Sequence, residues 1–206
     1  MKQFLLKNKY YYSTILLFVI VGGIVLIINT KAEVTLWVVN EHWSRFVDNY
    51  VLDVNAIGST FFSIAAVAFL WSEKGWRVAL KAALCFIAVM LVTQFGKHVL
   101  FPGTPRPTLY FEPGTLRLIG VKQLATESFP SGHTSASFAL ATFFSLFFRN
   151  KKGHWLFALL AFAVSYGRIY MSQHFITDVY AGMLIGVTVT TLVYYFYPQK
   201  WDVAKR

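Results

Sequence analysis

Two histidines of this sequence stand where they could act in acid–base or nucleophilic chemistry, and the first is His174. Asp178 follows it by four residues, so the two side chains are neighbours on one helix face if the helix is continuous there. A carboxylate beside an imidazole fixes the tautomer and holds the ring, as a nucleophile or a general base requires. The alternative for this pair is a polar contact between helices.

The second histidine, His133, belongs to the segment 129–133 (FPSGH), between the longest polar connection and an apolar run. Pro130 cannot continue a preceding helix and Ser131 is a favoured N-cap residue, so we expect a helix to begin here. Free N–H groups and the positive end of the helix dipole make such a terminus a site for phosphate. Gly132 lets a ligand approach the backbone closely. Alone, the segment is a weak signal, because Ser-Gly before a helix is also ordinary capping.

Three cations lie in or close to apolar runs and are candidates for a site: Lys97, Arg106 and Arg168. Arg168 lies well inside an otherwise apolar run, where an ionisable residue is costly and usually functional. Taken alone, Lys97 could be a lysine that snorkels from a helix end, and Arg106 could be a solvated loop arginine.

The composition indicates that a membrane surrounds these residues. Of the 206 residues, 56% are hydrophobic and only 14% are charged, which is more apolar material than one soluble core of this size can bury. The net charge of +10 does not indicate nucleic-acid binding, because the basic residues lie in short clusters between apolar runs. Cys85 is the single cysteine, which excludes a disulfide framework or a zinc cluster within one chain.

Six apolar runs are interpreted as membrane-spanning helices, since one span needs about 20 residues. They cover residues 13–28, 56–71, 76–101, 135–148, 155–172 and 176–197. The predicted fold is therefore all-α, an integral membrane bundle of six transmembrane helices, with residues 1–206 as one membrane-embedded domain. We expect the first run to stay as an anchor, because no small-residue cleavage pattern follows it.

Two connections between these runs are unusual. Residues 31–55 mix acidic and aromatic side chains, which favours an amphipathic helix on the membrane surface over about residues 34–54, or else a plain loop. Residues 101–129 are rich in Pro and Gly, and a loop this long in a compact protein is usually functional or disordered. Its hydrophobic segments 109–111 and 116–119 are expected to line or cover the entrance for a headgroup.

The distribution of cations predicts the topology. Six spans put both termini on one side, and the cations on that side are Lys2, Lys7, Lys9, Lys74, Arg77, Lys81, Arg149, Lys151, Lys152, Lys200, Lys205 and Arg206. Apart from the site cations, the opposite loops hold Lys31, Arg45, Arg117 and Lys122. By the positive-inside rule the termini are cytoplasmic, so the long loop and the candidate site face outward.

Together these residues resemble the motifs of the type-2 phosphatidic acid phosphatase superfamily of membrane lipid phosphatases. The family pattern is Lys-x6-Arg-Pro, then Pro-Ser-Gly-His, then Ser-Arg-x5-His with an Asp four residues later. The second motif is complete at residues 130–133, and the third keeps the spacing from Arg168 to His174, with Gly167 in place of the usual serine. In the first, eight residues separate Lys97 from Arg106. Either that connection has grown by two residues, or Lys97 does not fill the role of the family lysine.

The resemblance implies a role for each site residue. His174 would attack phosphorus and form a phosphohistidine while Asp178 orients its ring, and His133 would protonate the leaving oxygen and then help activate water. The phosphate oxygens would be held by the other predicted site residues: Lys97, Arg106, Ser131, Gly132 and Arg168. Fixed cations can replace a metal ion in this chemistry, and Glu127 and Asp178 are too few carboxylates for a hard-metal site. We therefore expect no metal and no other cofactor.

The function predicted from these features is metal-independent hydrolysis of a phosphate from a lipid, at the outer face of a bacterial-type inner (plasma) membrane. Undecaprenyl diphosphate and a glycerophospholipid phosphate, either phosphatidylglycerophosphate or phosphatidic acid, are slightly preferred as substrates, and a phosphate of lipid A is the alternative. The expected partners are this lipid and the bilayer, not nucleic acid, and the sequence does not decide the oligomeric state.

Three other classes of protein fit less well. A transporter or channel would also carry charges inside its spans, but it should show broken helices in paired halves, and none is visible. A non-catalytic lipid-binding membrane protein would keep Arg106 and Arg168 without needing both His133 and His174. The vanadium haloperoxidases share a related pocket, but their soluble character argues against that activity here.

Overall fold

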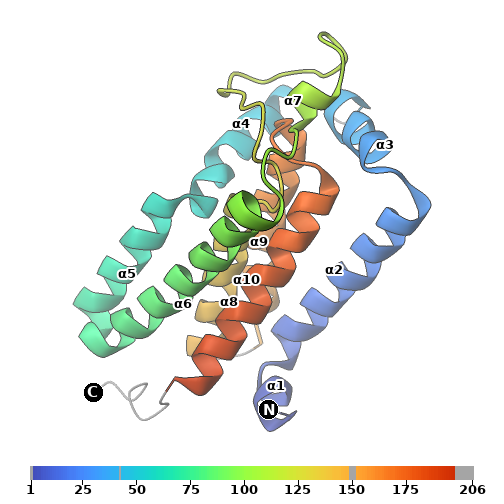
Figure 1. Ribbon diagram of the computed structural model, residues 1–206. Helices are drawn as coiled ribbons and strands as arrows, with labels where there is room; N and C mark the ends of the chain where they lie inside the picture. Colours follow the sequence, from blue (N-terminus) through green and yellow to red (C-terminus); the bar gives the residue numbers. More distant parts are fainter. Residues whose placement is uncertain (1, 42, 149–151, 198–206) are drawn as a thin grey trace.

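The computed structural model describes residues 2–41, 43–148 and 152–197, and in these ranges the chain is helical and contains no strand. The long helices form one bundle, and the long loop with the short helices lies at one end of it, which we call the outer end (Figure 1). The all-α prediction is confirmed. The elements are α1 (Lys2–Lys7), α2 (Lys9–Ile28), α3 (Lys31–Leu36), η1 (Trp37–Glu41), α4 (Arg45–Asn55), η2 (Ala56–Gly58), α5 (Thr60–Lys74), α6 (Trp76–Phe95), η3 (Gly96–Leu100), α7 (Pro107–Tyr110), α8 (Gly132–Phe147), α9 (Trp155–Tyr170) and α10 (Ile176–Phe196).

Helices occupy all six predicted apolar runs. Among the described residues, α2, α6 with η3, and α10 are each long and apolar enough to cross a membrane, and α4 with α5 would form a fourth span bent by 57°. The helices α8 and α9 have 16 residues each. Because α8 lies in contact with α6, α9 and α10, its residues face protein rather than lipid and need less apolar length. The protein is therefore a multi-pass membrane protein, and the number of six spans stays a prediction.

Two glycines of α10 allow it to pack closely against α8. A Cβ added at Gly182 would lie 2.7 Å from the carbonyl oxygen of Ser131, and one at Gly186 would lie 2.5 Å from that of Ser135. Only the smallest residue lets two helix backbones approach so closely. This contact brings the start of α10 to the N-terminus of α8, where the Ser131 N–H donates to the carbonyl oxygen of Asp178 at 3.0 Å.

The segment 31–55 is divided into α3, η1 and α4 rather than forming one helix over residues 34–54. A new helix begins at Arg45 because Ser44 caps it: its Oγ accepts the Val47 N–H at 3.2 Å. α4 buries Val51 against the bundle and leaves Phe46 78% exposed, so it is amphipathic as expected. Its location on a membrane surface stays a prediction.

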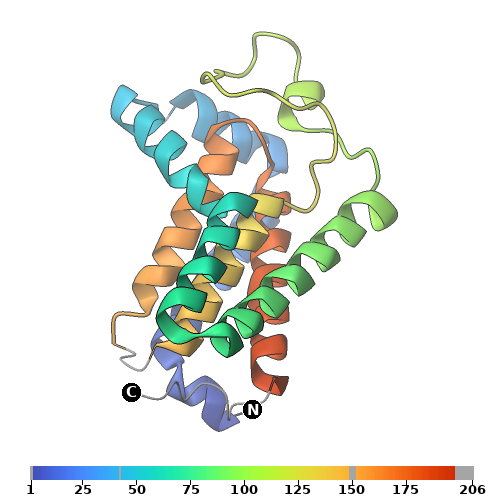
Figure 2. The same ribbon diagram turned by 90° about the vertical axis from the view of Figure 1, so that its left-hand side faces the viewer.

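The loop between η3 and α8 arches over the outer end of the bundle (Figure 2). Arg117 fastens its middle to α4, since one guanidinium nitrogen donates to the Asp48 carboxylate at 2.9 Å. Ile119 is buried among side chains of α4, α9 and α10. Tyr110 packs edge-on against Phe175, with 5.3 Å between the ring centroids. Both hydrophobic segments of the loop therefore lie against the outer end, and their role at a headgroup entrance stays a prediction.

The opposite end of the bundle carries α1, the turn between α5 and α6, and the end of α10 (Figure 1). This arrangement agrees with an even number of crossings. Five of the cations that the topology prediction uses lie outside the described residues: Arg149, Lys151, Lys200, Lys205 and Arg206. Which side of the membrane each end faces stays a prediction.

Candidate active site

His174 lies in the short connection between α9 and α10, and its Nδ1 is 3.4 Å from Oδ2 of Asp178. The condition for the two residues to share one helix face, a helix continuous from His174 to Asp178, is not met, because α10 begins only at Ile176. They meet because Asp178 is in the first turn of α10 and its carboxylate turns back toward the helix start. There Oδ2 also accepts the Phe175 N–H at 2.9 Å.

The carboxylate determines the tautomer of His174. Asp178 is itself held by Ser128, whose hydroxyl donates to Oδ2 at 2.5 Å, so Nδ1–H of the imidazole points at an anchored acceptor. Nε2 faces the other way, 3.5 Å from a terminal nitrogen of Arg106. Burial lowers the pKa of His174, and the nearby Arg168 and Arg106 lower it further. The ring is therefore neutral near pH 7, with a lone pair on Nε2.

Lys97 and Arg106 converge on one backbone carbonyl. The oxygen of Glu127 accepts from Lys97 Nζ at 2.6 Å and from a terminal nitrogen of Arg106 at 3.2 Å. Glu127 has φ 59°, a left-handed conformation that few non-glycine residues adopt, and it directs this carbonyl toward both cations. Arg106 also donates through Nε to the carbonyl oxygen of Thr126 at 2.8 Å. Lys97 thus reaches the same cluster as Arg106 despite the longer connection between them.

Arg168 completes the cation cluster from the last turn of α9. Its side chain is 7% exposed, and one terminal nitrogen donates to Oδ1 of Asn55 at 2.8 Å. The other terminal nitrogen is 3.4 Å from Oε1 of Gln173. Nε is buried and has no hydrogen-bond partner within the described part of the chain. A buried guanidinium N–H without an acceptor is suited to an anionic ligand.

The N-terminus of α8 lies beside Asp178, whose carbonyl oxygen accepts the Ser131 N–H. Ser131 is the N-cap, and its Oγ accepts the Thr134 N–H at 3.4 Å. Gly132 and His133 are the first two residues of the helix, so their N–H groups have no acceptor within it. These amides, rather than the Ser131 hydroxyl, are the groups that a phosphate oxygen could use.

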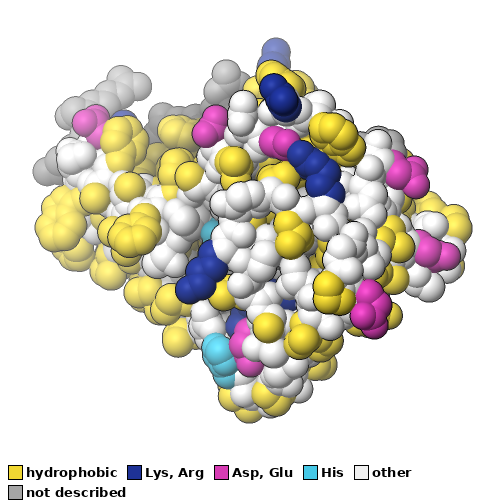
Figure 3. All heavy atoms as spheres, turned by 90° about the horizontal axis from the view of Figure 1, so that it is seen from above, with side chains coloured by type: hydrophobic (Ala, Val, Ile, Leu, Met, Phe, Trp, Pro, Cys, Tyr) yellow, Lys and Arg dark blue, Asp and Glu magenta, His cyan; other side chains and the backbone are white. Residues whose placement is uncertain are grey.

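The cations of the site are buried rather than on the protein surface. Seen onto the outer end, Lys and Arg side chains are scattered among acidic and hydrophobic ones and do not form one continuous basic patch (Figure 3). Lys97, Arg106 and Arg168 are only 8%, 5% and 7% exposed. Buried cations interact with an anion in a lower dielectric than surface cations do, so the site is suited to bind phosphate strongly.

The model of the PAP2 superfamily matches residues 78–202, which is more than half of the chain and includes every predicted site residue. The chain belongs to the PAP2 superfamily. The family assignment that the three motifs predict is thereby confirmed, and with it the membrane-phosphatase fold.

Relatives of this PAP2 protein include several named phosphatases. A lipid A 4'-phosphatase of Porphyromonas gingivalis is 44% identical over 66% of this chain and 59% of its own length, so the chain spans little more than half of that protein. The undecaprenyl-diphosphatase BcrC of Bacillus subtilis is 30% identical over 55% of this chain and 66% of its own length. The crystal structure of Aquifex aeolicus LpxE superposes with a TM-score of 0.66 and 26% identity, covering 80% of this chain and 94% of that one.

One departure from the PAP2 motifs has a structural explanation. Gly167 stands where the family usually has serine, directly before Arg168. A Cβ at this position would lie 3.1 Å from Cγ1 of Val51, which is tighter than ordinary contact. The glycine therefore allows α4 to pack close to α9, and this brings Asn55 to Arg168.

Three polar residues of the site were not predicted from the sequence: Asn55, Ser128 and Gln173. Asn55 contacts Arg168, Ser128 contacts Asp178, and Gln173 contacts both Arg106 and Arg168. Gln173 and Ser128 each lie within three residues of a predicted catalytic residue or motif, which is a signal that could have been used. Asn55 lies over a hundred residues from Arg168, and no pattern in the sequence connects them.

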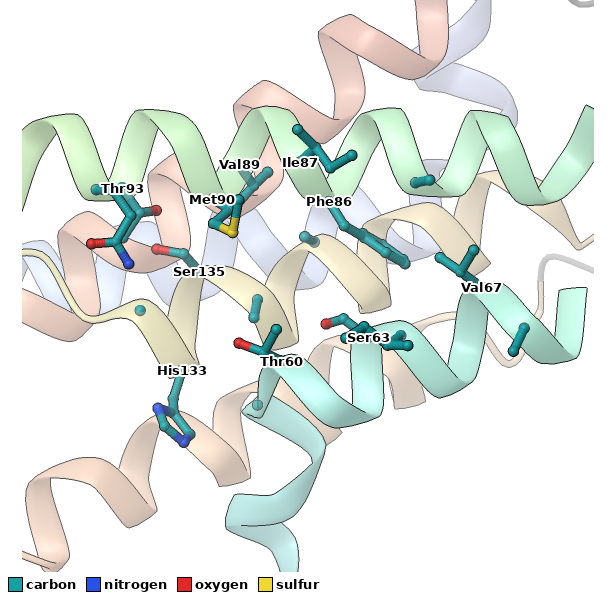
Figure 4. Close-up of a pocket in the computed structure, with 18 of the residues that line it drawn as sticks. Thr60, Ser63, Val67, Phe86, Ile87, Val89, Met90, Thr93, His133 and Ser135 are labelled. Carbon is teal, nitrogen blue, oxygen red and sulfur yellow. The ribbon is translucent and has the colours of Figure 1, made fainter.

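A groove of about 660 Å³ between α5, α6 and α8 ends at His133 (Figure 4). Its walls are mainly apolar and include Ile64 and Val67 of α5 with Phe86, Ile87 and Met90 of α6. Such a volume is typical of ligand-binding clefts.

Within the described ranges, no three His, Cys, Asp or Glu side chains gather as they would to hold a metal ion. The absence of a metal requirement stays a prediction.

Proposed function

We propose that this chain is a lipid phosphatase that uses His174 as a nucleophile. The observation that carries the proposal is the position of its Nε2, which faces the buried cations while Nδ1 is held by the anchored Asp178 carboxylate. The nearby groove supports a lipid as the substrate, because its apolar walls lead from helices α5 and α6 to His133. A chain lying in that groove would bring its phosphate to the N-terminus of α8.

In the proposed first step, the lone pair of His174 Nε2 attacks phosphorus and the bond to the lipid oxygen breaks. His133, which takes up a proton when the phosphate anion binds beside it, gives that proton to the lipid oxygen. The Nδ1–H bond to Asp178 stabilises the positive charge on the His174 ring. Lys97, Arg106 and Arg168 hold the phosphoryl oxygens, whose charge the transition state spreads over them. In the second step, neutral His133 takes a proton from water and the water oxygen attacks phosphorus. The bond between phosphorus and Nε2 breaks, its electron pair returns to His174, and inorganic phosphate leaves.

We infer the substrate class from the groove and the relatives together. Apolar walls fit an acyl chain and a prenyl chain equally well, so the groove itself favours no single lipid. The names of the relatives favour a phosphate of lipid A and undecaprenyl diphosphate. Phosphatidic acid and phosphatidylglycerophosphate are the glycerophospholipid candidates. We place the reaction at the outer face of the plasma membrane, with the chain termini in the cytoplasm, on the charge asymmetry of the loops.

The proposal is tested by phosphate release from these four lipids with the purified protein, beside His174→Ala as the matched inactive control. Release by the wild-type protein and none by the variant is the expected result. If the wild-type protein binds vanadate but hydrolyses none of the lipids, it is a lipid-binding relative rather than an enzyme, and the proposal is wrong.

A further inference from the structure

Gln173 directly precedes the proposed nucleophile, and its side chain lies between two arginines. Its Oε1 is 3.3 Å from a terminal nitrogen of Arg106 and 3.4 Å from one of Arg168. Its carbonyl oxygen accepts a further bond from Arg106 at 2.8 Å. Gln173 is 4% exposed, and it is the one side chain in the described ranges with hydrogen bonds to both guanidinium groups.

The other half of the amide is tied to the outer loop. Nε2 of Gln173 donates to Oε1 of Gln123 at 2.7 Å and to the carbonyl oxygen of Lys122 at 3.3 Å. An amide has one acceptor and one donor group, so these partners determine its orientation: the oxygen faces the cations and the nitrogen faces the loop. Gln123 is anchored in turn, since its own nitrogen lies 3.4 Å from the carbonyl oxygen of Met171.

We infer that Gln173 is a positioning residue, which holds Arg106 and Arg168 at the separation and orientation needed around a phosphoryl group at His174. The inference deepens the proposed function and rests on it. Each arginine is also fixed at its far side, Arg106 by the Thr126 carbonyl and Arg168 by the Asn55 side chain. Gln173 supplies the link between the two.

The side chain of Gln173 is neutral, and this preserves the positive charge of the two arginines. A carboxylate in the same place would pair with both guanidinium groups and cancel charge that a phosphate must meet. An amide oxygen accepts the same hydrogen bonds without adding a negative charge. Among the described residues, the one carboxylate in contact with the nucleophile is that of Asp178, and it is already bound by His174, Phe175 and Ser128. Glutamine therefore orients the arginines and leaves their positive charge available.

The test compares Gln173→Leu with the near-isosteric Gln173→Glu. Gln3→Leu, at an exposed glutamine of α1 at the far end of the bundle, is the matched control. The dissociation constant of vanadate is measured by titration calorimetry, kcat and KM are measured with phosphatidic acid in mixed micelles, and thermal stability is followed in detergent. We expect the vanadate dissociation constant to rise about tenfold or more in Gln173→Leu, as for loss of hydrogen bonds to charged groups. Gln173→Glu keeps an acceptor for the two arginines but replaces the donor to Gln123 and Lys122 by an oxygen, and its negative charge should weaken vanadate binding by a similar factor.

The two variants separate positioning from a purely structural role. A structural role would lower the yield or stability of Gln173→Leu and leave KM and the vanadate constant of the folded protein unchanged, and that result would overturn the inference. If Gln173→Leu does not fold, Gln173→Glu decides alone, and vanadate binding within twofold of the wild-type value refutes the inference. If the wild-type protein binds vanadate without hydrolysing any lipid, the proposed function fails, while the binding constants still test the role of Gln173.

Discussion

The contact between α8 and α10 predicts that a change from glycine to alanine destabilises this protein, whereas such a change usually stabilises a helix. Replacing a helical glycine by alanine normally stabilises a helix by about 1 kcal/mol, because alanine has the higher helix propensity. At Gly182 the new Cβ would lie 2.7 Å from the Ser131 carbonyl oxygen, whereas ordinary contact begins at 3.4 Å. The helices would therefore have to separate by about 0.7 Å at this point. A backbone carbonyl within a helix cap cannot rotate away as a flexible side chain would.

The expected loss of stability follows from overpacking, and the expected loss of activity follows from the displacement of site residues. Forcing an extra methyl group into a close-packed contact costs about 1–3 kcal/mol, which outweighs the gain in propensity. The same separation stretches the 3.0 Å hydrogen bond from the Ser131 N–H to the Asp178 carbonyl, and it moves His174 relative to the start of α8. Since a displacement of about 1 Å can reduce catalysis by about a hundredfold, we expect Gly182→Ala to lower kcat/KM by about 10–100-fold.

The assay is thermal unfolding in detergent together with phosphate release from a lipid substrate. Gly153→Ala is the matched control, because a Cβ at Gly153 has no neighbour within 4 Å and its backbone is not in the left-handed region. The control should keep the stability and activity of the wild-type protein. A Gly182→Ala protein that is as stable and as active as the control would refute the close contact between α8 and α10.

Four further predictions concern the chemistry and the topology. His174→Ala should abolish turnover and form no acid-labile phosphoenzyme, whereas substantial residual hydrolysis would mean that the nucleophile is wrongly assigned. His133→Ala should slow phosphoenzyme formation, measured in a single turnover, at least about tenfold more for phosphatidic acid than for undecaprenyl diphosphate, because an alkoxide needs its proton more than a phosphate does. Equal losses for the two lipids would remove the role of His133 as the acid. Activity should persist in excess chelator and be inhibited by vanadate; loss on chelation with recovery in magnesium would contradict the mechanism. In a Cys85→Ala background, Thr115→Cys should react with an impermeant thiol reagent in intact cells and Gly153→Cys should not, and the reverse pattern would put the site in the cytoplasm.

The sequence was sufficient to predict the six long helices of the bundle because each one is an apolar run ended by a clear local signal. The predicted run 176–197 ends one residue after α10, which spans Ile176–Phe196. The expected helix start at Ser131 is the observed N-cap of α8. The run 135–148 was drawn three residues short at its start, since Gly132 to Thr134 are not apolar and only the cap identifies them. Apolar periodicity could not show how α4 bends into α5, because that angle depends on packing against α9.

The predicted site residues were found from the types and spacing of side chains, and the contacts that hold them were not. Lys97 and Arg106 meet at the carbonyl oxygen of Glu127, and a backbone carbonyl carries no signature in the sequence. The His174–Asp178 contact was expected from helical spacing, yet it arises from the capping geometry of α10. Helical spacing and the capping geometry both place these two side chains close together. The expected contact is therefore present, although the local structure that produces it differs from the expected one.

The arrangement of charge explains why the site needs so rigid a frame. Three buried cations around one histidine repel each other, and before a phosphate binds they are held mainly by neutral acceptors: the Glu127 carbonyl, the Asn55 amide and the Gln173 amide. Neutral acceptors satisfy the N–H groups without reducing the net charge, so the attraction for an incoming phosphate is retained. Fixing such acceptors requires backbone and side chains from α4, α9 and the outer loop to meet at one point. The close helix contacts made possible by Gly167 and Gly182 provide that meeting point, and so we expect residues remote from the phosphate to contribute to binding it.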